Sequence, residues 1–165
     1  MFATESNLFG AINLPCEIWE RRLGNQLDGG DCVVLSSDMR VKVPATTLYT
    51  YPDIVVICGK PEFEDDVFDT LLNPVVIIEV LSESTEKYDR GVKFKNYREL
   101  PSVQQVVLVS QQEPSVDGFV RQPDNTWLLT SAQGLESTIA FPMLKASVPL
   151  AEVYAGITFS GATLR

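Results

Sequence analysis

A chain of 165 residues that is 45% hydrophobic is long enough to form one domain around a proper core. It contains no histidine, which excludes Ser-His and Cys-His nucleophiles and imidazole metal sites, so any such chemistry must come from carboxylates, lysines and tyrosines. The formal charge of −9 argues against tight nonspecific binding to nucleic acid, although a local basic face or a carboxylate metal site is compatible with it.

The first third of the chain predicts one helix followed by a hairpin. Apolar residues recur at helical intervals over 14–27, and the glycine pair within 28–31 ends that helix. Two strands are predicted at 32–36 and 39–43, joined by a tight turn. Residues 43–52 then form a loop.

The middle of the chain predicts two short buried strands, at 53–58 and 75–81. Between them, the acids of 61–74 lack the turn glycine and the ordered ligand positions of a calcium loop, so a solvated loop is expected. Residues 82–100 predict a helix capped by Ser84 or Thr85.

The last third predicts a strand-rich tail and a closing helix. The expected elements are strands at 102–110, 115–122 and 126–131, a turn at 123–125, a short segment at 137–141 and a helix at 149–157. The whole order predicts one α/β or α+β domain over residues 1–165, with a mixed sheet.

The cysteines and the apolar runs indicate in which cellular compartment the protein is expected. Cys16, Cys32 and Cys58 stand far apart in odd number, which predicts reduced, buried thiols of a cytoplasmic protein and neither a disulfide frame nor a zinc site. No apolar run approaches the ~20 residues that span a bilayer, and no basic-then-apolar leader opens the chain, so no membrane partner is expected.

One carboxylate, Glu79, interrupts the most apolar strand. The strand period of two places it on the same face as Ile77 and Leu81, where an ionised acid is costly unless a charge compensates it. Asp53 stands at the start of the other buried strand, so pairing of the two strands brings both acids to one sheet end. Such oxygen ligands suit Mg²⁺ or Mn²⁺. The structural alternative is a solvated Asp53 at a loop edge and a Glu79 paired to a surface lysine.

Three stretches carry a resemblance to a known family: YPDIVVIC (51–58), PVVIIEVLSEST (74–85) and YDRGVKFKNYRELPSVQQVVLVSQ (88–111). They resemble the Uma-type putative restriction endonucleases, which belong to the PD-(D/E)XK nuclease superfamily. The likeness continues through Trp127 and PLAEVY (149–154). It implies a restriction endonuclease-like fold, in which helices flank a mixed β-sheet core.

The resemblance also implies a reaction. Asp53 and Glu79 would hold Mg²⁺ or Mn²⁺, with the backbone carbonyl of Val80 as a further ligand. Such a site suits an endonuclease that hydrolyses phosphodiester bonds, with DNA as the expected substrate. A homodimer is expected, because cutting two strands is simplest with two-fold symmetry.

The lysine of the superfamily's Glu-x-Lys pattern is replaced here by Leu81, so it is expected on the following helix. Lys93 shares a helical stripe with Asp89 and Tyr97. We therefore expect Lys93 to pair with Glu79 and to act in catalysis, supported by Asp89 and Tyr97. The other lysines of this helix, Lys87 and Lys95, are expected at the surface.

A competing hypothesis is a nuclease-fold module that binds or assembles without catalysis. Family members usually open with a further acidic segment and a histidine, whereas Asn7 stands near that position here and Glu5 is the only nearby acid. The acidic charge also favours this hypothesis. The joint presence of Asp53, Glu79, Asp89 and Lys93 favours the nuclease, because fold stability alone does not require all four.

Overall fold

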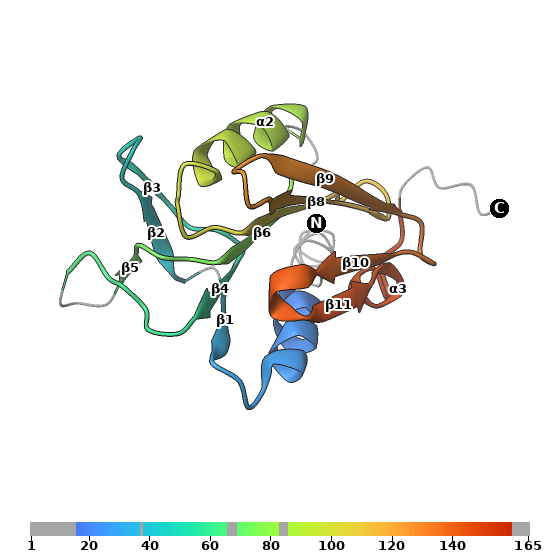
Figure 1. The fold of residues 1–165 in the computed structure, drawn as a ribbon. Coiled ribbons are helices and arrows are strands. Elements are labelled where there is room, and N and C mark those ends of the chain that lie inside the picture. Colours follow the sequence, from blue (N-terminus) through green and yellow to red (C-terminus); the bar gives the residue numbers. More distant parts are fainter. Residues whose placement is uncertain (1–15, 37, 66–68, 83–85, 160–165) are drawn as a thin grey trace, which may run out of the picture.

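A six-stranded mixed sheet forms the centre of the molecule (Figure 1). The computed structural model describes residues 16–36, 38–65, 69–82 and 86–159, without the side chain of Asp89. The strand order is β1-β4-β6-β7-β8-β9. These strands are β1 (Cys32–Ser36), β4 (Ile54–Cys58), β6 (Val76–Val80), β7 (Gln105–Val109), β8 (Ser115–Arg121) and β9 (Trp127–Gln133).

Two smaller sheets and the helices cover the central sheet. The three-stranded sheet contains β2 (Arg40–Val43), β3 (Leu48–Thr50) and β5 (Thr70–Leu71), and a hairpin contains β10 (Thr138–Phe141) and β11 (Ala146–Pro149). The first helix is described over residues 16–27, and α2 (Glu86–Tyr97), the 3₁₀ turn η1 (Pro142–Leu144) and α3 (Leu150–Val153) follow. None of the described helices is long and apolar enough to cross a lipid bilayer.

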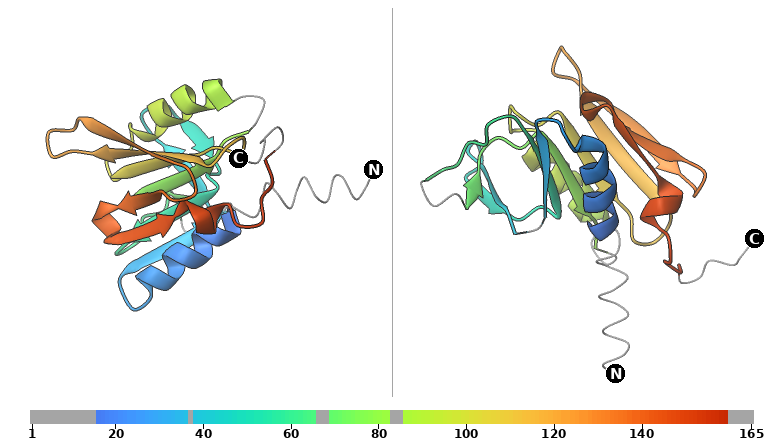
Figure 2. Two further views of the ribbon diagram at one scale, coloured as in Figure 1. Left: turned by 90° about the vertical axis from the view of Figure 1, so that its right-hand side faces the viewer. Right: turned by 90° about the horizontal axis from the view of Figure 1, so that it is seen from below.

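The strand period of two divides the apolar side chains between two cores. On one face, the central strands pack against the first helix, the β10–β11 hairpin and α3. On the other face, they pack against α2 and the three-stranded sheet. Figures 1 and 2 show these two layers on either side of the sheet. The strands β6 and β7 are parallel, and α2 provides the crossover connection that a parallel pair requires.

The predicted strands of the first third exist, but their predicted pairing is wrong. The strand β1 pairs with β4 in the central sheet, and β2 pairs with β3 in the small sheet. The hairpin turn therefore lies in the segment predicted as a loop, where Thr47 has a φ of 55° and the Thr46 N–H donates to the Val43 carbonyl. The β2 strand buries only its valines, which suits a small covering sheet better than the centre.

The prediction of three reduced thiols is also wrong, because Cys32 and Cys58 form a disulfide. The antiparallel register of β1 and β4 places these two residues directly opposite each other. A sequence separation of 26 residues conceals this proximity until the strand pairing is known. Cys16 remains a free thiol.

The tail of the chain differs in two details from its prediction. A strand that had not been predicted, β11, pairs with β10 along its whole length. The closing helix is only four residues long, although Leu150, Val153 and Tyr154 are buried as expected. The predicted caps Ser84 and Thr85 lie outside the described residues, as do Glu5 and Asn7.

The disulfide gives a stability prediction. Reduction with excess dithiothreitol should lower the free energy of unfolding by about 2–4 kcal/mol, because the unfolded chain regains the entropy of a closed loop. Urea unfolding followed by tryptophan fluorescence measures the difference. The double variant C32S/C58S should match the reduced protein without reductant, and Cys16→Ser should behave as the wild type. Equal stability with and without reductant would contradict the prediction.

Candidate active site

The antiparallel pairing of β4 and β6 brings Asp53 and Glu79 together. Ile54 is paired with Ile78, so the next step of the register places Asp53 beside Glu79. Strand alternation turns both carboxylates toward the face that α2 covers. Asp53 Oδ2 accepts a hydrogen bond from the backbone N–H of Val80 at 2.7 Å, which ties the start of β4 to the end of β6. The predicted convergence of the two acids is therefore confirmed.

Glu79 is enclosed by two side chains from α2. Only 2% of the residue is exposed, and each of its carboxylate oxygens accepts a hydrogen bond from this helix. The Tyr97 hydroxyl donates to Oε1 at 2.5 Å, and the Lys93 ammonium donates to Oε2 at 3.0 Å. The Lys93 side chain is still 31% exposed, whereas that of Glu79 is 3% exposed, so the pair lies at the border between the core and solvent. The predicted pair of Glu79 and Lys93 is confirmed as a contact, whereas its role in catalysis stays a prediction.

Burial dominates the electrostatics of Glu79. It raises the pKa of this carboxyl from 4.5 to about 7, with a further increase from the charge of Asp53. The charge of Lys93 and the hydrogen bonds from Lys93 and Tyr97 act in the opposite direction and favour the ionised form. The pKa of Tyr97 is raised by burial and by the neighbouring carboxylate, so this phenol keeps its proton and remains a donor.

Aromatic packing fixes the position of α2 over the sheet. Phe94 stacks on Phe119 of β8 with ring centroids 4.1 Å apart and meets the edge of Trp127 on β9. Leu100, just beyond the helix, is buried in the same core. The helix therefore rests on Phe94 and Leu100, as expected, and this places Lys93 along the border of the contact. Lys87 and Lys95 are exposed, also as expected.

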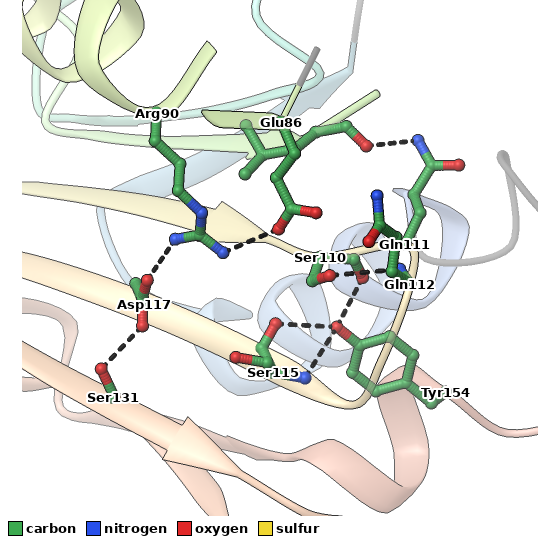
Figure 3. A network of polar contacts seen from close by, with 10 residues as sticks. Glu86, Arg90, Ser110, Gln111, Gln112, Ser115, Asp117, Ser131 and Tyr154 are labelled. Carbon is green, nitrogen blue, oxygen red and sulfur yellow. Dashed lines mark hydrogen bonds and ion pairs between the residues drawn. The ribbon is translucent and has the colours of Figure 1, made fainter. Parts of the chain in front are cut away.

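The ion pair between Arg90 and Asp117 is a second contact that anchors α2 to the sheet (Figure 3). Arg90 forms ion pairs with Asp117 on β8 and with Glu86 on its own helix. Ser131 on β9 donates a hydrogen bond to the other oxygen of Asp117 at 2.7 Å. Arg90 precedes Lys93 by one helical turn, so this pair helps to set the rotation of the helix about its axis. Sequence reasoning missed it, because only the fold brings Asp117 near Arg90.

Polar residues that follow β7 contact the chain just after β6 and the start of β8. The Gln111 side chain donates to the backbone carbonyl of Leu81, two residues after Glu79, at 2.6 Å. The Tyr154 hydroxyl lies 2.7 Å from the carbonyl oxygen of Ser110 and 3.0 Å from that of Ser115, so α3 is tied to the β7–β8 connection (Figure 3). The Gln111 contact therefore helps to hold the chain in place just after Glu79.

Cys16, at the beginning of the described part of the first helix, was not predicted to belong to this region. Burial raises the pKa of its thiol to about 12, and the charges of Asp53 and Glu79 contribute to the increase. The thiol is therefore neutral and close enough to both carboxylates to feel their field. Nothing in the sequence pattern signals this proximity, which depends on how the helix crosses the sheet.

The donor atoms at this site fit a small divalent cation. Asp53 and Glu79 are neighbouring acids whose repulsion contributes to the raised pKa of Glu79, and a cation between them would relieve it. Carboxylate oxygens keep lone pairs after accepting one hydrogen bond, and an all-oxygen set with the carbonyl of Val80 suits Mg²⁺ or Mn²⁺. Among the described residues, at this site or at any other, no group of three or more cysteine, aspartate or glutamate residues is arranged to hold a metal ion. Water and substrate would have to complete the coordination.

This chain has a nuclease-like fold, in which a mixed sheet carries two acids at neighbouring strand ends beside a helix that supplies a lysine. The crystal structure of a putative nuclease belonging to DUF820 from Anabaena variabilis superposes with a TM-score of 0.71 over 88% of this chain and 80% of that chain. Its sequence identity is 12%, so the likeness concerns the fold. A family model described as Uma2, Putative restriction endonuclease, matches residues 17–151, and the chain belongs to this family.

Two proteins from Synechocystis sp. are similar in sequence to most of this chain. The uncharacterized proteins slr1290 and sll1609 are 35% and 34% identical to the chain over 135 and 132 residues. The aligned regions cover 82% and 80% of this chain and 70% of each relative. The resemblance drawn from the sequence motifs is thus confirmed at the level of the family and the fold.

The burial of Glu79 predicts a pH-dependent cost in stability. The folded-state pKa of about 7 exceeds the ordinary 4.5, so stability falls as the pH rises through this window. Glu79→Gln removes the ionisation. In the presence of EDTA at pH 8, this variant should have a free energy of unfolding that exceeds that of the wild type by on the order of a few kcal/mol, and it should unfold at a higher temperature. Near pH 4, the two proteins should unfold at nearly the same temperature.

Thermal unfolding of both proteins at each pH measures this difference and cancels the contributions of the other titrating groups. A Glu79→Gln variant that is less stable than the wild type at pH 8 would show that Lys93 more than compensates for the burial of the charge.

Proposed function

We propose that this protein is a metal-dependent endonuclease that hydrolyses phosphodiester bonds of nucleic acid, with DNA as its substrate. The observation that carries the proposal is the buried Glu79 carboxylate, which lies beside Asp53 and is hydrogen-bonded by Lys93. A chain that needed only a stable core would gain nothing from a charged acid at this position, because an apolar residue of similar size would avoid the cost of burial. Membership of a restriction endonuclease family supports the same reaction class.

Each residue of the site has a distinct role in the proposed reaction. Asp53, Glu79 and the carbonyl of Val80 would hold Mg²⁺ or Mn²⁺, which, when bound, polarises the scissile phosphate and helps to activate water. Lys93 has the exposure and the charge to stabilise the negative charge that develops on the phosphate oxygens. Tyr97 keeps Glu79 in one rotamer through its hydrogen bond. The proposed support of Lys93 by Asp89 involves a side chain outside the described set.

The acidic charge of the protein restricts how it meets its substrate. A formal charge of −9 repels a polyanion, so the proposed divalent cation and Lys93 must provide the local attraction at the site. A homodimer belongs to the same proposal, because two sites related by two-fold symmetry can each cut one strand of a duplex.

The second candidate is a non-catalytic module of the same fold, and one observation favours it. Lys93 donates a hydrogen bond to one carboxylate oxygen of Glu79, and Tyr97 donates to the other. A site that is electrostatically satisfied in this way could be retained for structure alone. The two candidates differ in their response to divalent metal and in the effect of Lys93 on cleavage.

Substitutions at the site separate the two candidates by activity. With Mn²⁺ and with plasmid or single-stranded DNA, Asp53→Ala, Glu79→Ala and Lys93→Ala should each lower cleavage at least roughly 100-fold, because each removes charge stabilisation at the phosphate. Lys95→Ala is the matched control, since it removes an exposed lysine from the same helix. Equal cleavage by wild type and all variants would refute the assignment, and no cleavage by any protein would favour the non-catalytic module.

Metal binding can be measured without substrate. Titration calorimetry with Mn²⁺ should show one site for each wild-type chain, and the affinity should fall at least roughly tenfold in Asp53→Ala, since one of two carboxylate ligands is lost. Lys95→Ala should bind as the wild type does. Binding that is unchanged in Asp53→Ala would place the cation elsewhere.

A further inference from the structure

The strand β9 forms one margin of the central sheet. Within the part of the chain that the structure describes, β9 pairs with β8 on its inner side, and no strand pairs with its outer edge. The β8–β9 hairpin extends from the body of the molecule (Figure 2). The β10–β11 hairpin, which follows β9, lies across the face of the sheet instead, where Gln105 donates to the carbonyl of Ala140. The backbone groups along this edge are therefore available to another strand.

The composition of β9 is unusual for an open edge. Its seven residues, WLLTSAQ, contain no charged side chain and no proline. Leu128 and Leu129 are 54% and 52% exposed. Proteins usually protect an open edge with lysine, proline or a bulge, because an uncharged edge pairs readily with other strands. An edge with none of these protections is suited to a regular partner.

We propose that this partner is a second copy of the chain, whose β9 pairs with this one in antiparallel orientation across a two-fold axis. The net charge of −9 makes two copies repel each other, so a self-contact requires a surface without acids. Within β9 itself, each residue would meet an uncharged residue of the other copy, so no like-charge pair would arise between the two paired strands. The inference specifies the homodimer that accompanies the proposed function, but the pairing itself does not require nuclease activity.

The opposite margin of the sheet, β1, is the less suitable edge. It is also uncharged, but it borders a groove of about 720 Å³ that Glu17, Glu20 and Asp28 line, with Arg21 as the only basic residue among the described lining residues. A two-fold contact at β1 would bring these acids close to their copies. The charge argument that favours β9 therefore disfavours β1.

The proposed interface lies near the candidate active site. Ser131 on β9 donates to Asp117, and Asp117 holds Arg90, one turn before Lys93 on α2. Pairing along β9 would restrain this strand and, through Asp117, the helix that presents Lys93. The dimer would thus contain two candidate sites, and in each copy α2 would be connected to the interface through Asp117 and β9.

The oligomeric state tests the proposal directly. Analytical ultracentrifugation over a range of micromolar concentrations should give twice the 18.3 kDa chain mass for the wild type. Higher salt should strengthen the association, because it screens the repulsion between two acidic chains. Leu128→Lys and Leu129→Lys should each weaken the dimer at least tenfold, since they place like charges along the paired edge.

Two matched controls carry the same kind of change at similar exposure. Leu135→Lys, at a residue that is 50% exposed just beyond β9, and Val33→Lys, at a residue that is 56% exposed on β1, should leave the dimer intact. A monomeric wild type would overturn the proposal, and so would a dimer that Val33→Lys disrupts while Leu129→Lys does not.

Hydrogen exchange provides a readout that does not depend on the folding of any variant. The amides of β9 should become protected as the wild-type concentration rises, and those of β1 should not. Protection that is independent of concentration in β9 would also overturn the proposal. Because mass and exchange are measured without metal or DNA, a failure here is distinct from a failure of the proposed nuclease activity.

Discussion

The Glu79 carboxylate lies on an apolar strand, so its hydrogen-bond donors must come from another element, and α2 supplies both of them. Lys93 and Tyr97 lie one helical turn apart, so a single helix orientation satisfies both carboxylate oxygens. The rest of the structure can be understood as support for that orientation: Phe94 sets the distance of the helix from the sheet, and Arg90 sets its rotation. Removing one donor from a buried acid leaves an unsatisfied charge, which explains why the helix needs more than one anchor.

The pairing of β4 with β6 has the same importance for Asp53. Its carboxylate accepts the N–H of Val80 and so joins the two strands at the point where regular pairing ends. The repulsion from Asp53 contributes to the raised pKa of Glu79, and an apolar residue in place of Glu79 would remove this repulsion without loss of a backbone hydrogen bond. Strain of this kind is typical of functional sites and is difficult to explain by folding alone.

The sequence predicts the features that depend on local periodicity and misses those that depend on distant pairing. The stripe containing Lys93 and Tyr97 follows from the helical repeat, and β6 follows from its β-branched run, so the contact with Glu79 could be predicted. The partner of β1 could not, because the hydrophobic patterns of β1 and β2 are both compatible with a hairpin. The disulfide depends on that pairing and was missed for the same reason, as was the proximity of Cys16 to the acids.

The disulfide between Cys32 and Cys58 makes the two margins of the sheet unequal. At one margin, a covalent bond prevents β1 from peeling away from β4. At the other, β9 is retained by backbone hydrogen bonds to β8 and by side-chain packing. In a single copy of the chain, where the outer edge of β9 has no strand partner, fraying of the sheet should therefore start at β9 and advance inward, toward the strands that support α2. The strand β4, with Asp53 at its beginning, lies at the protected side and should be among the last to open.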